Sequence, residues 1–169
     1  MKNVVLIGMP GSGKSTVGVV LAKVLGYRFV DTDLVIQEQE GKLLKEIIAE
    51  RGNEGFLELE NEVNRRLSVE KSVIATGGSV IYGKEAMEHL REIGNVVYLK
   101  LAYPALRRRL GNLKLRGVVL KDGQTLKDLY EERVPYYEKY AHIVIDEAGL
   151  DVEGTMEEIV KVLRENINM

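Results

Sequence analysis

One stretch, residues 8–16 with the sequence GMPGSGKST, constrains the fold of this 169-residue chain more than any other. It matches the pattern G-x-x-x-x-G-K-[ST], whose backbone N–H groups surround nucleotide phosphates. An apolar run at residues 4–7 precedes it, and a helical pattern over residues 16–25 follows. Strand, glycine turn and helix is the context that the pattern requires, so the stretch predicts a phosphate site at a strand end. The alternative is a glycine-rich turn that binds nothing.

The residue types in this turn assign its contacts. We predict nucleotide binding by the residues that close the pattern, which are Gly11, Ser12, Gly13, Lys14, Ser15 and Thr16. The Lys14 ammonium would reach the β- and γ-phosphates, and the Ser15 hydroxyl would ligate Mg²⁺. The start of the following helix adds partial positive charge, which favours an anion there.

Apolar runs and helical patterns alternate along the rest of the chain. The runs lie at residues 4–7, 28–30, 73–75, 96–101 and 143–145. Alternating strands and helices predict an α/β fold with a parallel sheet and helices on both faces, here as one domain over residues 1–169. Ligands of such sheets bind at the carboxyl ends of the strands, so the residues after each run matter most.

Two acids follow the second run, Asp31 and Asp33, with Thr32 between them. Carboxylates at i and i+2 of an extended segment point the same way. Beside a triphosphate, one would hold Mg²⁺ and the other would accept a proton from an attacking hydroxyl. An Asp before a helical pattern is also an ordinary helix cap. Both interpretations hold if Asp31 faces the metal while Thr32 or Asp33 lies near the cap.

The region between the second and third runs is predicted to cover an acceptor. Residues 34–70 read as about three helices that break at Gly41 and Gly52. Phe56, Leu59 and Val63 have the i, i+3, i+7 spacing of a core-facing stripe.

Glycines follow the third run. Gly77 and Gly78 indicate close approach of the backbone to a ligand, although an ordinary turn explains the pair equally well in isolation.

Basic residues dominate the second half of the chain. Residues 111–124 lack periodicity and read as a lid, whose Arg116 would close on the triphosphate and exclude water. A solvated basic loop is the alternative. Arg133 lies near Pro135 in a predicted helix, where it faces either inward or the solvent.

Composition limits the partners. The formal net charge is −2, which gives no sign of nucleic acid binding, and the chain contains no Cys, so disulfides are excluded. No apolar stretch approaches the ~18 residues of a membrane span, and the first strand leaves no room for a signal peptide. We expect a cytoplasmic monomer that binds small molecules.

Taken together, several segments resemble the shikimate kinase family, within the nucleoside monophosphate kinase-like P-loop fold. They are the P-loop, FVDTD at 29–33, GF at 55–56, ATGG at 75–78, Arg109 and Arg116 seven positions apart, and ERVPYY at 132–137. The resemblance implies a three-layer α/β/α fold with a five-stranded parallel sheet and a mobile lid. It implies transfer of the γ-phosphoryl group of ATP to the 3-hydroxyl of shikimate, with Mg²⁺.

The resemblance also assigns roles. Lys14 resembles the phosphate lysine, Ser15 the Mg²⁺ ligand and Asp31 the acid near the metal. Asp33 resembles the acid that grips the substrate hydroxyls and assists proton removal. Lys14 and Asp33 would therefore be catalytic, together with Arg116.

The remaining roles concern both substrates. Gly77 and Gly78 resemble the backbone strip that faces the substrate ring, and Arg133 one of two arginines that hold the shikimate carboxylate. Arg109 resembles the arginine that stacks on adenine, and Arg116 the lid arginine on the phosphates.

Three positions depart from the family pattern. Leu57 stands where the family has the second carboxylate-binding arginine, and residues 116–119 read RGVV where the family has RPLL. The family has three glycines in a row where this chain has Gly77, Gly78 and Ser79, so either Ser79 replaces the third glycine or one residue is deleted. Lys42, Lys45 or Arg51 are candidates to replace the arginine. Two alternatives therefore stay open: a kinase for another hydroxylated metabolite or a nucleoside monophosphate, and a nucleotide-binding protein without acceptor turnover.

Overall fold

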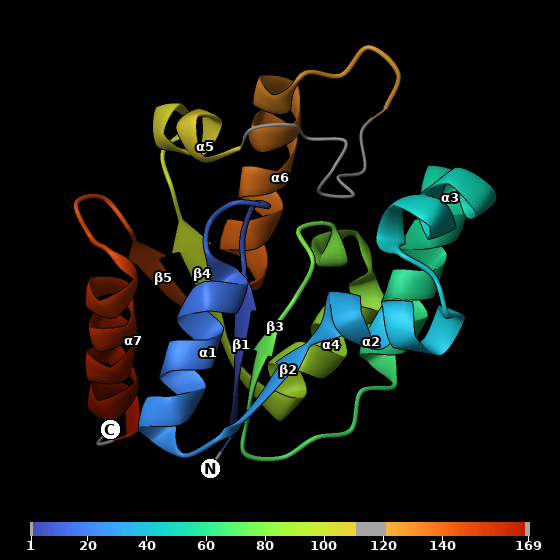
Figure 1. The fold of residues 1–169 in the computed structure, drawn as a ribbon. Coiled ribbons are helices and arrows are strands. Elements are labelled where there is room, and N and C mark those ends of the chain that lie inside the picture. Colours follow the sequence, from blue (N-terminus) through green and yellow to red (C-terminus); the bar gives the residue numbers. More distant parts are fainter. Residues whose placement is uncertain (1, 111–120, 168–169) are drawn as a thin grey trace.

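The computed structural model describes residues 2–110 and 121–167, and its core is one parallel sheet (Figure 1). The sheet has the order β2-β3-β1-β4-β5. Its strands are β1 (Asn3–Ile7), β2 (Arg28–Asp31), β3 (Ser72–Ala75), β4 (Gly94–Lys100) and β5 (Ile143–Asp146). Neighbouring strands pair in parallel, with Val5 opposite Ile74 of β3 and opposite Val96 of β4. The expected α/β fold with five parallel strands is confirmed.

Helices cover both faces of the sheet. They are α1 (Lys14–Leu25), α2 (Thr32–Glu40), α3 (Leu44–Arg65), α4 (Lys84–Ile93), α5 (Tyr103–Arg109), α6 (Leu126–Tyr140) and α7 (Val152–Ile167), with a 3₁₀ turn η1 (Val80–Tyr82). One buried cluster joins the sheet to α1 and α7, and another joins it to α4, α5 and α6. Beyond the β2 edge, α2 and α3 pack on each other around a third cluster that includes Phe56 (Figure 1).

Glycines end or bend the helices near β2. Gly41 ends α2 with φ 66°, a left-handed conformation that costs glycine little. Gly52 bends α3 with φ 75° and ψ 172°. The expected breaks at both glycines are confirmed. The last helix begins at Val152.

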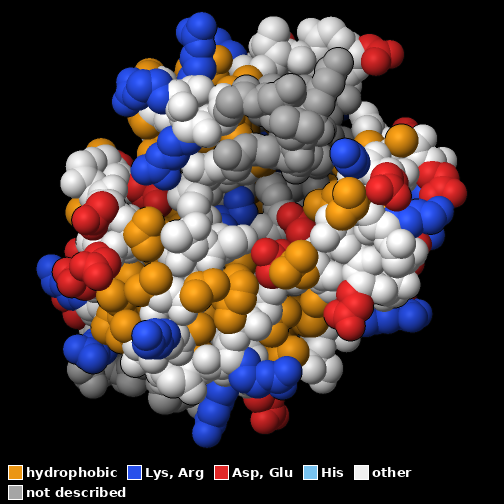
Figure 2. Space-filling model, in the orientation of Figure 1, with side chains coloured by type: hydrophobic (Ala, Val, Ile, Leu, Met, Phe, Trp, Pro, Cys, Tyr) orange, Lys and Arg blue, Asp and Glu red, His pale blue; other side chains and the backbone are white. Residues whose placement is uncertain are grey.

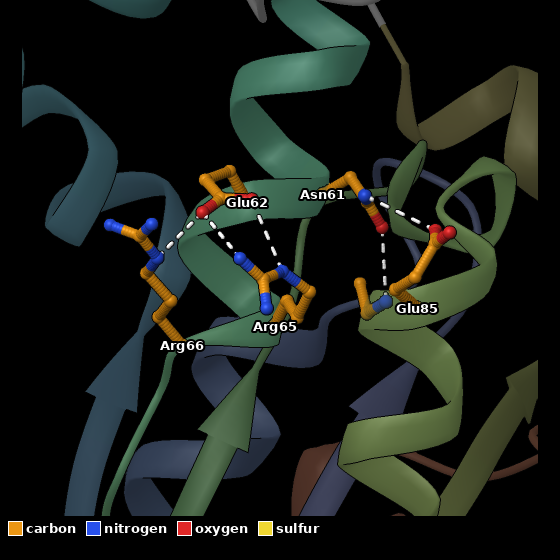
Figure 3. A network of polar contacts seen from close by, with 6 residues as sticks. Asn61, Glu62, Arg65, Arg66 and Glu85 are labelled. Carbon is orange, nitrogen blue, oxygen red and sulfur yellow. Dashed lines mark hydrogen bonds and ion pairs between the residues drawn. The ribbon is translucent and has the colours of Figure 1, made fainter.

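The second half of α3 is fixed to α4 through Asn61 (Figure 3). Its Oδ1 accepts a hydrogen bond from the Ala86 N–H at 3.0 Å, which satisfies a free donor in the first turn of α4. On the neighbouring surface Glu62 pairs with Arg65 and Arg66 (Figure 3), and such exposed pairs contribute about 0–1 kcal/mol. The Asn61 contact therefore positions this part of α3 more than the ion pairs do.

Within residues 2–110 and 121–167, no helix has both the length and the apolar character that crossing a membrane requires.

Candidate active site

A cavity of about 540 Å³ lies at the carboxyl ends of the strands, where the sheet order brings β2, β3 and β1 together. On the face of the molecule drawn in Figure 2, basic and acidic side chains meet at a hollow near the middle. Ten of the predicted site residues line it: Gly11, Gly13, Lys14, Ser15, Thr16, Asp33, Gly77, Gly78, Arg109 and Arg133. Residues that are distant in the sequence thus form one site.

The P-loop wraps around the start of α1, and its lysine is already hydrogen bonded. Gly11 and Gly13 have φ of 84° and 89°, which only glycine adopts freely. The buried Lys14 Nζ donates to the carbonyl oxygens of Gly8 and Met9, each at 2.8 Å. Burial lowers the pKa of Lys14 from 10.5 to about 8, against the opposing charges of nearby carboxylates such as Asp33. An anionic phosphate chain would restore the charged form.

Ser15 and Asp31 form the predicted metal position. The Ser15 Oγ donates to Asp31 Oδ2 at 3.0 Å, which places two oxygen ligands together beside the P-loop. Hydroxyl and carboxylate oxygens suit a hard divalent cation, which takes its remaining ligands from phosphates and water. The described residues hold no group of three or more His, Cys, Asp or Glu placed to bind a metal ion.

The start of α2 differs from the expectation. Asp31 itself is the N-cap, since its Oδ1 accepts from the Asp33 N–H at 3.0 Å and the Leu34 N–H at 3.3 Å. The helix begins at Thr32, so the prediction of an extended segment through Asp33 was wrong, whereas Thr32 and Asp33 do lie next to the cap, as expected. The two acids have different surroundings, because one oxygen of Asp31 accepts from free N–H groups of the helix while the other faces Ser15.

Asp33 lines the cavity from the first turn of α2. Burial raises its pKa from 3.8 to about 6, and the charge of Asp31 adds to this while Lys14 opposes it. A carboxylate with a pKa near neutrality suits a group that accepts a proton from a hydroxyl.

Gly77 and Gly78 follow β3 at positions where neighbouring side chains approach the backbone closely. A Cβ on Gly77 would lie 2.6 Å from Asp33 Oδ1 and 2.8 Å from Glu60 Oε2. A Cβ on Gly78 would lie 2.9 Å from a guanidinium nitrogen of Arg133. The carbonyl of Gly78 also accepts a hydrogen bond from the Tyr137 hydroxyl at 2.7 Å. Both glycines are thus required by close approach of functional side chains.

Arg133 points inward, which closes the alternative of a solvated residue. It is 1% exposed, and its guanidinium carbon lies 5.5 Å from the centre of the Tyr82 ring. Tyr137 follows one turn later on α6. Its ring stacks on that of Tyr98 of β4, with 5.1 Å between the ring centres, so it is a packing residue. The aromatic rings therefore hold a buried cation at the cavity wall.

Two arginines were predicted for the nucleotide. Arg109 lines the cavity at the end of α5, and its Nη1 lies 3.5 Å from the Ser12 carbonyl oxygen. The lid was predicted over residues 111–124, of which residues 111–120, with Arg116, lie outside the described residues. Ser12 is fully buried under the P-loop and does not line the cavity.

None of the three candidate replacements for an arginine at position 57 lies in the cavity. Lys42 pairs with Glu50 and Arg51 with Glu40, while Lys45 is exposed. Leu57 itself packs against the cluster between α2 and α3. Among the described residues, the basic groups that line the cavity are Lys14, Arg109 and Arg133.

Glu60, which is 2% exposed and lines the cavity, is not among the predicted site residues. A signal for it was present. Glu60 is four residues after Phe56 and three before Val63, so it lies on the buried face of α3. An acid within an otherwise apolar stripe indicates either a functional group or a buried pair.

The fold and site together define a P-loop kinase. A family model described as shikimate kinase matches residues 10–164. The curated shikimate kinases of Thermodesulfovibrio yellowstonii and Clostridium botulinum strain Okra are 37% and 40% identical. Those alignments cover 95% and 97% of this chain, and 94% and 95% of those proteins. This chain belongs to the shikimate kinase family.

A solved structure agrees with the family. The shikimate kinase of Acinetobacter baumannii in complex with shikimate superposes with a TM-score of 0.90 at 32% identity. The superposition covers 98% of this chain and 94% of that one.

Proposed function

We propose that this chain transfers the γ-phosphoryl group of ATP to a hydroxyl of shikimate. One observation carries the proposal: a single cavity joins the P-loop lysine to the buried acid Asp33 and the buried cation Arg133. That combination suits a polyphosphate on one side and a hydroxylated carboxylic acid on the other. The relatives are named for this reaction, and one of their structures contains shikimate.

The residues divide the work by their chemistry. Lys14 leaves the carbonyls of Gly8 and Met9 for the β- and γ-phosphates and neutralises charge that develops during transfer. Asp33 orients the acceptor hydroxyl and accepts its proton. Arg133 binds the acceptor carboxylate, while Arg109 binds the nucleotide next to the P-loop. Arg116 belongs to the same proposal as a cation on the phosphates.

A divalent metal accompanies ATP in this family, and we assign Mg²⁺ to Ser15 and Asp31. Their oxygens are 3.0 Å apart. When bound, the metal would neutralise phosphate charge and fix the triphosphate for transfer. The site needs no further protein ligand, because Mg²⁺ usually keeps several waters and phosphate oxygens. We also propose a monomer in the cytoplasm, where ATP is supplied.

The test is steady-state release of ADP with ATP and Mg²⁺, with and without shikimate. Saturable stimulation at a KM in the usual range of about 1 μM to 1 mM is expected. Arg133→Lys is the matched variant, because it keeps the charge and loses the planar fork, and it should raise the KM for shikimate more than that for ATP. Intact ATP binding with no response to shikimate would overturn the acceptor and leave another hydroxylated metabolite as the substrate.

A further inference from the structure

One carboxyl oxygen in the cavity wall has no hydrogen-bond partner. The Oε1 of Glu60 accepts a hydrogen bond from the Ser79 hydroxyl at 2.5 Å, and both residues are buried. The Oε2 of the same carboxyl group is buried and has no partner among the described residues. Such a group is costly and calls for an explanation, since nearly all buried polar atoms are paired.

The unpaired oxygen lies next to the proposed acceptor position. A Cβ on Gly77 would come within 2.8 Å of Glu60 Oε2 and within 2.6 Å of Asp33 Oδ1. Both carboxyl oxygens therefore approach the same side of Gly77 and lie close to each other in the wall of the cavity that the two acids line. A molecule held by Asp33 over Gly77 would reach Glu60 as well.

No other polar side chain of α3 lines this cavity. Leu44 and Phe56 are apolar, and Leu57 packs between α2 and α3. Glu60 is thus the polar group that α3 supplies, and Ser79 from the loop after β3 fixes its orientation.

The charges around Glu60 favour its neutral form. Burial raises its pKa to about 8, the charge of Asp33 on α2 raises it further, and the Ser79 hydrogen bond lowers it. Two cations, Arg133 on α6 and Lys14 on α1, also lower it, and Tyr137 of α6 faces the same group. A neutral carboxyl group carries an O–H donor in addition to its acceptors.

We propose that Glu60, oriented by Ser79, determines acceptor specificity by donating a hydrogen bond from its free oxygen to an acceptor oxygen next to the one that Asp33 holds. The inference rests on the proposed function, in which this cavity binds a hydroxylated acid. Glu60 would thus give the acceptor a neutral hydrogen-bond partner in a cavity where, among the described residues, the buried arginine is Arg133. Ser79 acts through Glu60 and is a positioning residue.

The experiment measures the KM for shikimate from pH 6 to pH 9 at saturating ATP. For the wild type, the KM should rise roughly tenfold between pH 7 and pH 9, because the neutral fraction of an acid with pKa about 8 falls by that factor. Glu60→Gln keeps a neutral donor that does not titrate, so its KM should stay near the wild-type value at pH 7 and change little with pH. Lys14 also titrates in this range, but its titration affects kcat and the KM for ATP. Both of these effects should persist in Glu60→Gln.

Two more variants complete the test. Glu60→Ala and Ser79→Ala should raise the KM for shikimate by roughly threefold to tenfold while the KM for ATP is unchanged, as expected for one neutral hydrogen bond. Glu58→Gln, two residues away and exposed on α3, is the matched control and should behave as the wild type.

The outcomes separate the two proposals. A wild type without shikimate-dependent ADP release would overturn both. An active wild type would overturn the role of Glu60 alone if Glu60→Ala kept the wild-type KM. The same holds if Glu60→Gln showed the wild-type pH dependence.

Discussion

At the scale of single residues, Lys14 is the side chain on which the proposed phosphoryl transfer should depend most. It is buried and hydrogen bonded to two P-loop carbonyls, which keep its ammonium at the loop until phosphate oxygens replace them. Lys14→Met should lower kcat by roughly 100-fold to 1,000-fold, the usual effect of removing one preorganised group that stabilises developing charge. Rates of ADP release measure this. Lys23→Met, in the exposed last turn of the same helix, should have no effect, and an active Lys14→Met would contradict the role.

Asp33 is predicted to act on the acceptor rather than on ATP. Asp33→Asn keeps the shape of the side chain and removes its ability to take a proton. It should lower kcat by roughly 100-fold to 10,000-fold, as loss of a general base does, with little change in the KM for ATP. Steady-state kinetics with both substrates varied provide the measurement. If the KM for ATP rose as steeply as kcat fell, Asp33 would belong to the nucleotide site instead.

At the scale of elements, Asp31 links the start of α2 to the metal position through its two oxygens. Asn caps a helix about as well as Asp, so Asp31→Asn should leave the melting temperature near the wild-type value. The loss of charge should raise the Mg²⁺ concentration for half-maximal rate roughly tenfold or more.

Asp31→Ala separates these two effects. It should show the same shift in Mg²⁺ dependence and also lose about 1 kcal/mol of stability through the missing cap. Thermal melting together with Mg²⁺ titrations of activity checks both variants. Equal Mg²⁺ dependence in the wild type and Asp31→Asn would remove Asp31 from the metal site.

The elements also show what the sequence could predict. The strands and the P-loop were predictable because apolar runs and glycine turns are local signals. The start of α2 at Thr32 was missed because a capping Asp and an extended Asp look alike in sequence. The direction of Arg133 was left open, since packing against Tyr82 and Tyr137 decides it and those contacts are tertiary.

Glu60 was missed for another reason. It lies in an acidic stretch with Glu58 and Glu62, and composition does not say which acid turns inward. The position of Glu60 on the helix relative to Phe56 does identify it as the inward acid, but only if α3 runs unbroken through this stretch.

At the scale of the whole molecule, burial of several acids should make stability depend on pH. Burial raises the pKa of Asp33 to about 6, of Glu147 to about 7 and of Glu60 to about 8. Between the unfolded value of each acid and these values, the folded state holds more protons, so raising the pH disfavours it. The free energy of unfolding should fall from pH 5 to pH 8.

Urea unfolding across this range measures the dependence. Glu60→Gln should reduce the slope, because the amide binds no proton in either state, and the variant should gain stability relative to the wild type as the pH rises. Glu58→Gln is again the control. A slope unchanged in Glu60→Gln would mean that Glu60 is ionised in the folded protein at pH 7.

The resting hydrogen bonds of Lys14 also bear on which anions the protein accepts. Two of the three N–H donors of its ammonium bond to the Gly8 and Met9 carbonyls, so an anion that takes more than one donor must compete with existing contacts. A single inorganic phosphate offers little beyond that exchange. A nucleotide triphosphate compensates for it through the remaining N–H groups of the loop and through Arg109. The existing hydrogen bonds of Lys14 therefore weaken the binding of free phosphate relative to that of ATP, which keeps the P-loop available for ATP.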